Sequence, residues 1–222
     1  MAGPPLLHSN RCSSVDGALR WLAAPVLRLA ARLIGRESAW DRLAIRVPAT
    51  VFGPGSMQPF AEYFRGPSSV PVQSIDDIVA WLQTCEYVAD LELFHERDVW
   101  QHPASFEKLR RGDCEDFALW AWRKLGEIGI DAEFIVGRVV SDDSTAIDRQ
   151  HAWVVYRVVG TEFLFEPAAR NPSRIRRRLA DAMDEYVPHF AVNHRFDTDT
   201  FVGCAADSHR RTLSSGSPAT TA

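Results

Sequence analysis

Residues 111–118 read Arg-Gly-Asp-Cys-Glu-Asp-Phe-Ala, and this stretch decides how the rest of the chain is interpreted. Gly112 interrupts regular structure just before Cys114, and an apolar, alanine-rich run with tryptophans follows. The pattern predicts a helix over residues 114–129 that begins at Cys114. Backbone N–H groups are free in a first helical turn, and the helix dipole favours negative charge there. We therefore expect the pKa of the Cys114 thiol to lie below its ordinary value of about 8.5.

The segments that follow this helix have the pattern of strands. Residues 132–140 and 151–159 are rich in β-branched and aromatic side chains, and residues 162–166 form a third such run after a turn at Gly160. Because the helix and the strands each have an apolar face to bury, we expect them to pack together. The predicted fold class is α+β, with the helix that carries Cys114 lying on an antiparallel sheet.

The chain is expected to contain one main domain with an extension at each end. Residues 1–72 are predicted to be an N-terminal extension and linker, residues 73–205 the main domain, and residues 206–222 a disordered tail. A length of 222 residues suits one well-buried domain of this kind better than two. Late in the main domain, residues 174–186 are predicted to be helical and residues 187–193 to form an edge strand.

The N-terminal extension contains two further predicted elements. Apolar residues recur at helical spacing between residues 15 and 34, with arginines between them, which predicts an amphipathic helix. Such a helix can pack on the domain or contact a partner, and a basic amphipathic helix can also lie on a membrane surface. Residues 43–52 alternate enough to predict a strand.

Composition and cysteine spacing exclude several classes of protein. The net charge of −4 provides no overall attraction to nucleic acid, and no apolar run is long enough to span a membrane. Arginines interrupt the apolar stretch near the N-terminus, so we expect no secretory signal. The four cysteines, at positions 12, 85, 114 and 204, show no zinc-binding spacing, and we expect reduced thiols in a cytoplasmic protein.

Three residue types that cooperate in nucleophilic catalysis occur in order along the predicted elements. Cys114 begins the helix, His151 begins one strand and Glu166 ends the next. A cysteine nucleophile needs a base, and the base needs a third group that fixes its tautomer and orientation. Because the turn at Gly160 joins the two strands, we expect His151 and Glu166 to lie opposite each other, with Cβ atoms about 5 Å apart.

Four motifs give the chain a resemblance to a known superfamily. They are Trp-Gln-His-Pro at 100–103, Gly-Asp-Cys-Glu-Asp-Phe-Ala at 112–118, Gln-His-Ala-Trp-Val-Val at 150–155 and Phe-Glu-Pro at 165–167. Together they resemble the transglutaminase-like superfamily, and most closely its bacterial cysteine peptidases, over roughly residues 75–195. The resemblance implies a papain-like core with Cys114 as nucleophile, His151 as base and Glu166 as orienting acid. The family usually has Asp at this third position.

This resemblance implies a cysteine-dependent amide hydrolase, a peptidase or amidase that forms a thioester on a peptide or protein substrate and requires no cofactor. Two alternatives stay open. An amine acceptor would make the same site a protein-glutamine acyltransferase, and a non-catalytic module of this fold would only bind a peptide in its groove.

Several neighbouring residues have candidate supporting roles. In some members of the resembling group, acids at the positions of Asp113 and Glu115 hold calcium, so calcium is possible here. The simpler interpretation is that Asp113, Glu115 and Asp116 complement the positive helix start. The backbone N–H of Cys114 is a candidate donor to a developing oxyanion, with the side chains of Trp100 and Gln101 as weaker candidates. Asn171 is an alternative to Glu166, and the arginines at 174–178 are interpreted as a solvated helix face.

Overall fold

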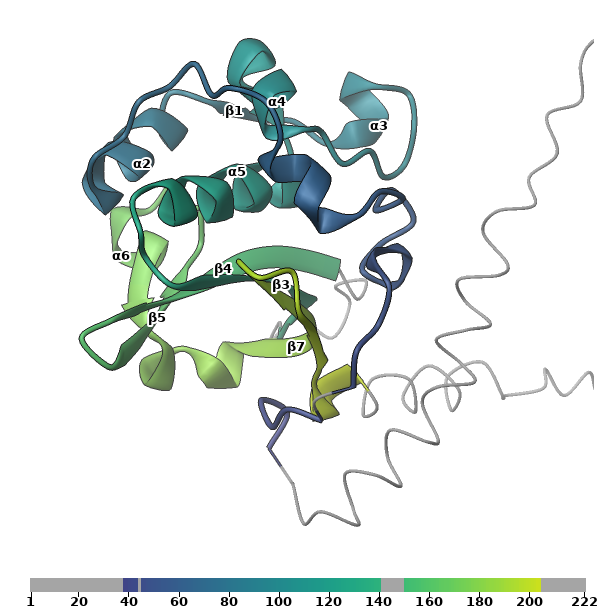
Figure 1. Cartoon of the computed structure of the whole chain (residues 1–222), viewed down its shortest axis with the longest axis vertical. Helices are drawn as coiled ribbons and strands as arrows, with labels where there is room; N and C mark the ends of the chain where they lie inside the picture. The colour runs from purple at the N-terminus through teal and green to yellow at the C-terminus, as the bar shows by residue number, and fades with distance from the viewer. Residues whose placement is uncertain (1–37, 44, 141–149, 205–222) are drawn as a thin grey trace, which may run out of the picture.

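One antiparallel sheet and a layer of helices make up the molecule (Figure 1). The computed structural model describes residues 38–43, 45–140 and 150–204. The sheet has six strands in the order β6-β5-β4-β3-β7-β8, and helices α2, α4 and α5 lie together over one of its faces. The predicted α+β class, with a helix packed on an antiparallel sheet, is confirmed.

Strands β3, β4 and β5 form the centre of the fold, as predicted. Val159 and Gly160 form the two-residue turn between β4 and β5, with φ values of 47° and 73°. Two left-handed residues in succession are what a type I′ hairpin turn requires. The bounds of the strands are β3 Ala132–Val139, β4 Gln150–Val158, β5 Thr161–Phe165, β6 Arg176–Arg178, β7 Tyr186–Asn193 and β8 Thr198–Thr200.

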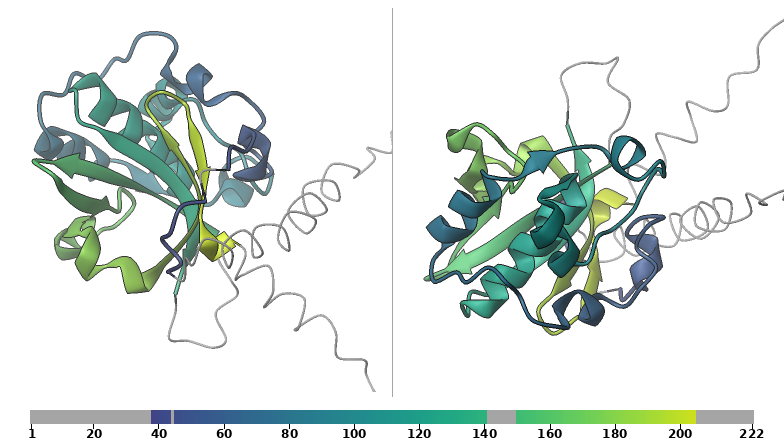
Figure 2. Two further views of the ribbon diagram at one scale, coloured as in Figure 1. Left: turned by 60° about the horizontal axis from the view of Figure 1, so that its bottom comes forward. Right: turned by 90° about the horizontal axis from the view of Figure 1, so that it is seen from above.

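Helix α5, Cys114–Glu127, is the central helix and confirms the predicted helix that begins at Cys114. It packs on β3 and β4 on one side and on α2 and α4 on the other, and every residue from Glu115 to Leu125 is buried (Figure 2). The remaining helical segments are α2 Ile75–Leu82, α3 Asp90–Leu93, α4 Pro103–Leu109, α6 Pro172–Ile175 and short 3₁₀ turns at Ala49–Val51, Phe60–Phe64, Leu179–Asp181 and Met183–Glu185.

Both faces of the sheet are buried. Phe134 and Val154 point into the large core beneath α5, whereas their neighbours Ile135 and Trp153 point into a smaller core on the opposite face. Gly137 is needed on β3 because a Cβ atom there would lie 2.2 Å from the carbonyl oxygen of Val187. The sheet is therefore a rigid central layer, which is a suitable support for side chains at its edge.

A separate pair of short strands lies beside the start of α5. Strand β1, Glu86–Tyr87, pairs in parallel with β2, Arg111–Gly112, immediately before Cys114. Gly112 permits a close approach here, because a Cβ atom at this position would lie 2.2 Å from Oδ2 of Asp116. The glycine thus does more than interrupt the chain before the helix.

Two predictions for the C-terminal part of the main domain are wrong. Residues 174–186 do not form one helix: α6 ends at Ile175, and β6 follows it because Phe163 and Phe165 of β5 pair with Arg178 and Arg176. Residues 187–193 do not form an edge strand, since β7 lies between β3 and β8. In both cases the pairing partner is distant in sequence.

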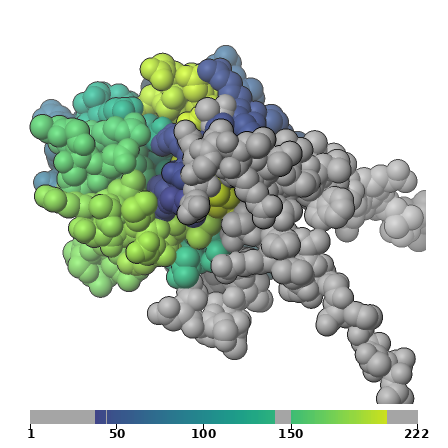
Figure 3. Space-filling model, turned by 90° about the horizontal axis from the view of Figure 1, so that it is seen from below, coloured from purple at the N-terminus to yellow at the C-terminus, as the bar shows by residue number. Residues whose placement is uncertain are grey.

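The strand predicted for residues 43–52 is also wrong. The backbone N–H of Leu43 donates to Thr200 O at 2.8 Å, and that of Val47 donates to Thr198 Oγ1 at 2.9 Å. This segment therefore runs beside β8 without forming a regular ladder of backbone hydrogen bonds. Figure 3 shows these first described residues against the C-terminal strands. The helix predicted for residues 15–34 and the tail at 206–222 lie outside the described residues. None of the described helices is long and apolar enough to cross a membrane.

Candidate active site

Cys114 is half-buried at the first position of α5 and lines a pocket of about 410 Å³. His151, at the start of β4, lines the same pocket. The other walls come from segments far apart in the sequence and include Gly53, Tyr87, Arg97 and Trp100. The fold therefore brings two of the three predicted site residues to one cavity.

His151 and Glu166 form a hydrogen bond. Nε2 of His151 lies 2.7 Å from Oε2 of Glu166, which is 7% exposed. The expectation that the two residues lie directly opposite each other is wrong, because Val154 pairs with Phe165 and the register places Glu166 level with Trp153. Glu166 reaches His151 across this diagonal, and the longer side chain of Glu suits that span better than Asp would.

Two aromatic residues that the sequence pattern did not assign to the site hold this pair. The hydroxyl group of Tyr186 donates to Oε2 of Glu166 at 3.2 Å, and the His151 ring stacks on Trp153 with centroids 6.1 Å apart. Because Nε2 of His151 faces Glu166, Nδ1 is the ring nitrogen left for proton exchange. Trp153 lies within the motif at 150–155, two residues after His151, which could have indicated its role. Tyr186 is the first residue of β7, and no motif pointed to it.

The thiol of Cys114 has a different environment from the one expected. Its Sγ donates to Oε2 of Glu115 at 3.2 Å, and Ala152, the residue after His151, lines the same pocket. Burial, followed by the charges of Glu115 and Asp113, raises the pKa of the Cys114 thiol well above its ordinary value. The expectation of a lowered pKa is therefore wrong, because burial, together with the adjacent acids, outweighs the helix dipole.

The acids beside Cys114 are packed against one another. Burial first, and then neighbouring carboxylates, raises the pKa values of both Glu115 and Asp116 well above the ordinary range. Ligand oxygens of Asp90, Asp98 and Glu115 all lie within 4.8 Å of one another, and the same holds for Asp90, Asp113 and Asp116. We call these five residues the acidic cluster. Three of them, Asp98, Asp113 and Glu115, line the pocket that holds Cys114.

The acidic cluster has the chemistry of a site for a hard cation. Within the described part of the chain, Oδ1 of Asp90, Oδ1 of Asp113 and Oε1 of Glu115 are buried and lack a hydrogen-bond partner. Calcium prefers six to eight oxygen ligands, with carboxylates prominent among them. Asp116 is less available, since its Oδ1 accepts the backbone N–H of Gln101 at 2.8 Å and its Oδ2 the side-chain amide of that residue.

The two side chains considered as oxyanion donors have other partners. Nε1 of Trp100 donates to Oδ1 of Asp98 at 3.0 Å, and Nε2 of Gln101 donates to the carbonyl oxygen of Arg111 at 2.9 Å. Asn171 is likewise occupied, because its Oδ1 caps α6 by accepting the N–H of Ser173 at 3.1 Å. The backbone N–H of Cys114 is the remaining candidate donor.

The arginine run after α6 lies on strand β6 and not on a helix. Arg174 and Arg177 both pair with Glu185, and Arg176 pairs with Asp76 at 2.7 Å. The other described cysteines, Cys85 and Cys204, are buried, and burial raises the pKa of Cys85 to about 11. Neither lines the pocket that holds Cys114.

No family model matches this chain. No curated protein matches it either. Among solved structures, calcium-bound LapG of Legionella pneumophila is similar at 13% identity and a TM-score of 0.44, covering 85% of this chain and 98% of LapG. EGTA-treated LapG is similar at 16% identity and a TM-score of 0.42, covering 77% and 82%. An inferred cysteine protease of Cytophaga hutchinsonii is similar at 14% identity and a TM-score of 0.38, covering 73% and 47%. The function is therefore argued from the site itself.

Proposed function

We propose that this protein is a cysteine-dependent amide hydrolase that acts on peptides or proteins. Cys114 is the nucleophile, His151 the general base and acid, and Glu166 the residue that orients His151. The observation that carries the proposal is the 2.7 Å hydrogen bond from Nε2 of His151 to Glu166, on a histidine that lines the same pocket as a cysteine thiol. A base held by an acid beside a nucleophile is the arrangement that covalent catalysis requires.

The proposed reaction begins from the neutral thiol, since the pKa of Cys114 is raised by burial and by Glu115. His151 Nδ1 takes the proton as Sγ attacks the amide carbonyl carbon, and the backbone N–H of Cys114 donates to the oxygen that becomes negative. His151 then protonates the leaving amine, which breaks the C–N bond and leaves a thioester. Water, deprotonated by His151, attacks the thioester, releases the carboxylic acid product and restores the thiol.

Two variants test the proposed roles directly. Cys114→Ala and His151→Ala should each reduce turnover of a peptide or amide substrate by about a thousandfold or more, without changing the thermal unfolding of the domain. His95→Ala, at an exposed position outside the pocket, is the matched control and should keep full turnover. Substantial turnover in either of the first two variants would remove the proposed roles.

The two alternatives make different predictions. An acyltransferase on the same site would transfer the acyl group to added primary amines in preference to water, which the ratio of amide to acid product measures. For a non-catalytic peptide-binding module, iodoacetamide should label Cys114, Cys85 and Cys204 equally slowly. Labelling of Cys114 that is faster than that of Cys85 and Cys204, and that is lost in His151→Ala, supports the hydrolase.

The second part of the proposal concerns the acidic cluster as a calcium site. Asp90, Asp98, Asp113 and Glu115 would hold the ion, and the three buried oxygens that lack a partner support this assignment. Bound calcium would supply positive charge beside Cys114. The cluster lies at the start of α5, so the ion would also tie β2 and α5 to the segment around Asp90 and Asp98.

Thermal unfolding tests this part without reference to activity. Calcium at a hundredfold excess over its dissociation constant stabilises a folded protein by about 2.7 kcal/mol, which corresponds to roughly 5–10 °C for a chain of this size. We expect that rise in EGTA-stripped wild-type protein and in Glu92→Gln, an exposed control on α3, but not in Glu115→Gln. An equal rise in all three proteins would contradict the site.

A further inference from the structure

The short strand β1 has an open backbone edge at Tyr87. In the parallel pair, the N–H of Glu86 donates to Arg110 O and the N–H of Val88 donates to Gly112 O, both at 2.8 Å. Because successive residues of a strand direct their backbone polar groups to opposite edges, the N–H and C=O of Tyr87 point away from β2. Within the described part of the chain, no backbone hydrogen bond to either group of Tyr87 is found.

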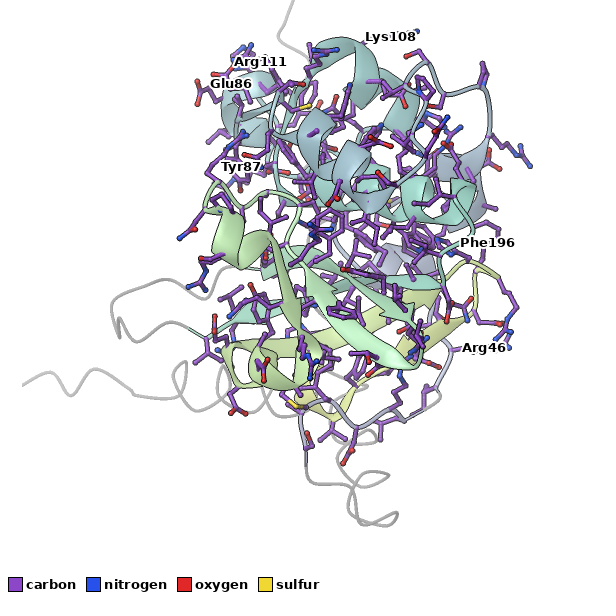
Figure 4. The ribbon with its side chains drawn as sticks, turned by 90° about the vertical axis from the view of Figure 1, so that its left-hand side faces the viewer. Arg46, Glu86, Tyr87, Lys108, Arg111 and Phe196 are labelled. Atoms are coloured by element: carbon purple, nitrogen blue, oxygen red, sulfur yellow. The ribbon has the colours of Figure 1, made fainter. Side chains whose placement is uncertain are left out.

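This open edge borders the pocket that contains Cys114. The Tyr87 side chain lines that pocket, its ring lies 6.2 Å from the ring of Phe117 in the first turn of α5, and it is 49% exposed. Figure 4 shows Glu86, Tyr87 and Arg111 grouped at one end of the molecule. An extended chain laid along the edge at Tyr87 would therefore enter the pocket that Cys114 lines.

The same edge is closed one step earlier in the chain. The carbonyl oxygen of Cys85, which faces the same side as Tyr87, accepts Nη2 of Arg170 at 2.5 Å. The loop that follows Glu166 thus covers the edge before Tyr87. What stays open is one N–H and one C=O on a single residue, which matches the two hydrogen bonds that one residue of an extended peptide exchanges with a strand.

We propose that Tyr87 binds the substrate main chain as an added strand: its N–H donates to a substrate carbonyl and its C=O accepts a substrate N–H. This inference rests on the proposed function and specifies the substrate as an extended, unfolded segment. The only charged pair on β1 and β2, Glu86 with Arg111 at 3.0 Å, is internally compensated, so recognition at this edge depends on the backbone and little on substrate charge.

A second folded chain is a poor occupant of this edge. One residue pair is too short to hold a strand alone, and independent sheets need more strands and a buried face. The bound peptide must therefore gain most of its affinity inside the pocket, with the Tyr87 pair setting its alignment. A substrate whose cleavable segment is already paired in a sheet or helix should be excluded.

The test compares alkylation rates of Cys114 by two reagents, acetyl-Ala-Ala chloromethyl ketone and iodoacetamide. Tyr87→Pro removes the outward N–H without removing a hydrogen bond that the fold uses, whereas Tyr87→Ala removes only the side chain. One backbone hydrogen bond corresponds to roughly a three- to tenfold change. We expect Tyr87→Pro to lower the rate with the peptide reagent by that factor relative to Tyr87→Ala, with the iodoacetamide rates equal.

A second measurement applies to the wild-type protein, in case Tyr87→Pro fails to fold. Two further reagents each carry an N-methyl group in place of the N–H of one of the two alanines. One of them should alkylate Cys114 three- to tenfold more slowly than the parent reagent, and the other should show a smaller effect. If all peptide reagents and both variants gave equal rates while iodoacetamide still labelled Cys114 selectively, substrate pairing at Tyr87 would be contradicted and the hydrolase proposal would stand. If neither the peptide reagent nor iodoacetamide labelled Cys114 in preference to Cys85, both the pairing at Tyr87 and the hydrolase proposal would be contradicted.

Discussion

The two ends of α5 bury charge in opposite ways. Near its C-terminal end, the ammonium group of Lys124 is fully buried and lies 2.8 Å from Glu127 and 3.4 Å from Glu107. Burial opposes ionisation of Glu107, but hydrogen bonds from Ser68, Ser69 and Trp120 lower its pKa to about 2. Every acid there has a donor or a cation.

At the N-terminal end, the same degree of burial has the opposite result. Burial raises the pKa of Glu115 well above its ordinary value, and the charges that act on it are those of other acids: Asp113, Asp116 and Asp98. Burial alone thus does not decide the ionisation of a carboxyl group, since its partners do. Uncompensated acids beside a reactive thiol reduce stability, and such local conflicts are expected at functional sites.

The largest effect is expected from breaking the compensated end. Lys124→Met removes the cation between Glu107 and Glu127 and also the hydrogen bond to Val70 O, at 2.6 Å. Removing one partner of a buried ion pair costs about 3–5 kcal/mol. We expect a loss near the lower limit, because Glu107 keeps its hydroxyl and indole donors. Urea unfolding measures it.

Lys108→Met is the matched control for this change. Lys108 is the chain's only other lysine and is exposed on α4, so its replacement should change the unfolding free energy by less than about 0.5 kcal/mol. Equal losses in the two variants would show that the buried ammonium group has no special role. In that case the contrast between the two ends of α5 would not hold.

The next effect in size is the pH dependence of stability in metal-free protein. Burial raises the pKa of Asp90 to about 6, so its folded form holds a proton that the unfolded form loses near pH 4. Stability from this group is full below pH 4 and is lost as the pH rises through 6, on the order of 2 kcal/mol. Glu107 acts oppositely, because its pKa of about 2 makes its contribution full above pH 4.5 and lost as the pH falls.

Urea unfolding in EGTA across pH 2–7 should therefore show maximum stability near pH 4–5. Asp90→Asn should reduce the decline between pH 4 and 6, to which Glu115 and Asp116 also contribute because their pKa values are raised too, and should leave the rise below pH 4 unchanged. A decline of the same size in the variant would show that Asp90 is not the group that titrates. Its carboxylate would then have to be compensated in the folded state.

Features that depend on local sequence could be predicted, whereas features that depend on contacts between residues distant in sequence could not. Helix α5 and strands β3 to β5 were predicted because their patterns are local, and the turn at Gly160 places β4 beside β5. Strand β6 was missed because its pairing with β5 overrides a locally helical pattern at 174–178. The sign of the Cys114 pKa shift was missed because the local sequence around Glu115 is typical of an exposed acid at a helix start, whereas Glu115 is buried in the structure. Only the fold brings Asp90 and Asp98 against it and excludes water.

The smallest effect is expected at Glu166, another buried acid, whose hydrogen-bond partners are a histidine and a tyrosine instead of a cation. Tyr186→Phe removes the donor at 3.2 Å and leaves the ring that packs on Trp153, with centroids 5.0 Å apart. If Tyr186 positions Glu166 and through it His151, kcat should fall roughly three- to tenfold while KM stays unchanged. A merely structural role would lower the melting temperature and leave kcat of the folded fraction intact.

Tyr156→Phe, a buried position elsewhere on β4, is the control and should leave kcat unchanged. An equal kcat for wild type and Tyr186→Phe would mean that Glu166 is held by His151 alone, and that this acid needs less compensation than either end of α5 implies.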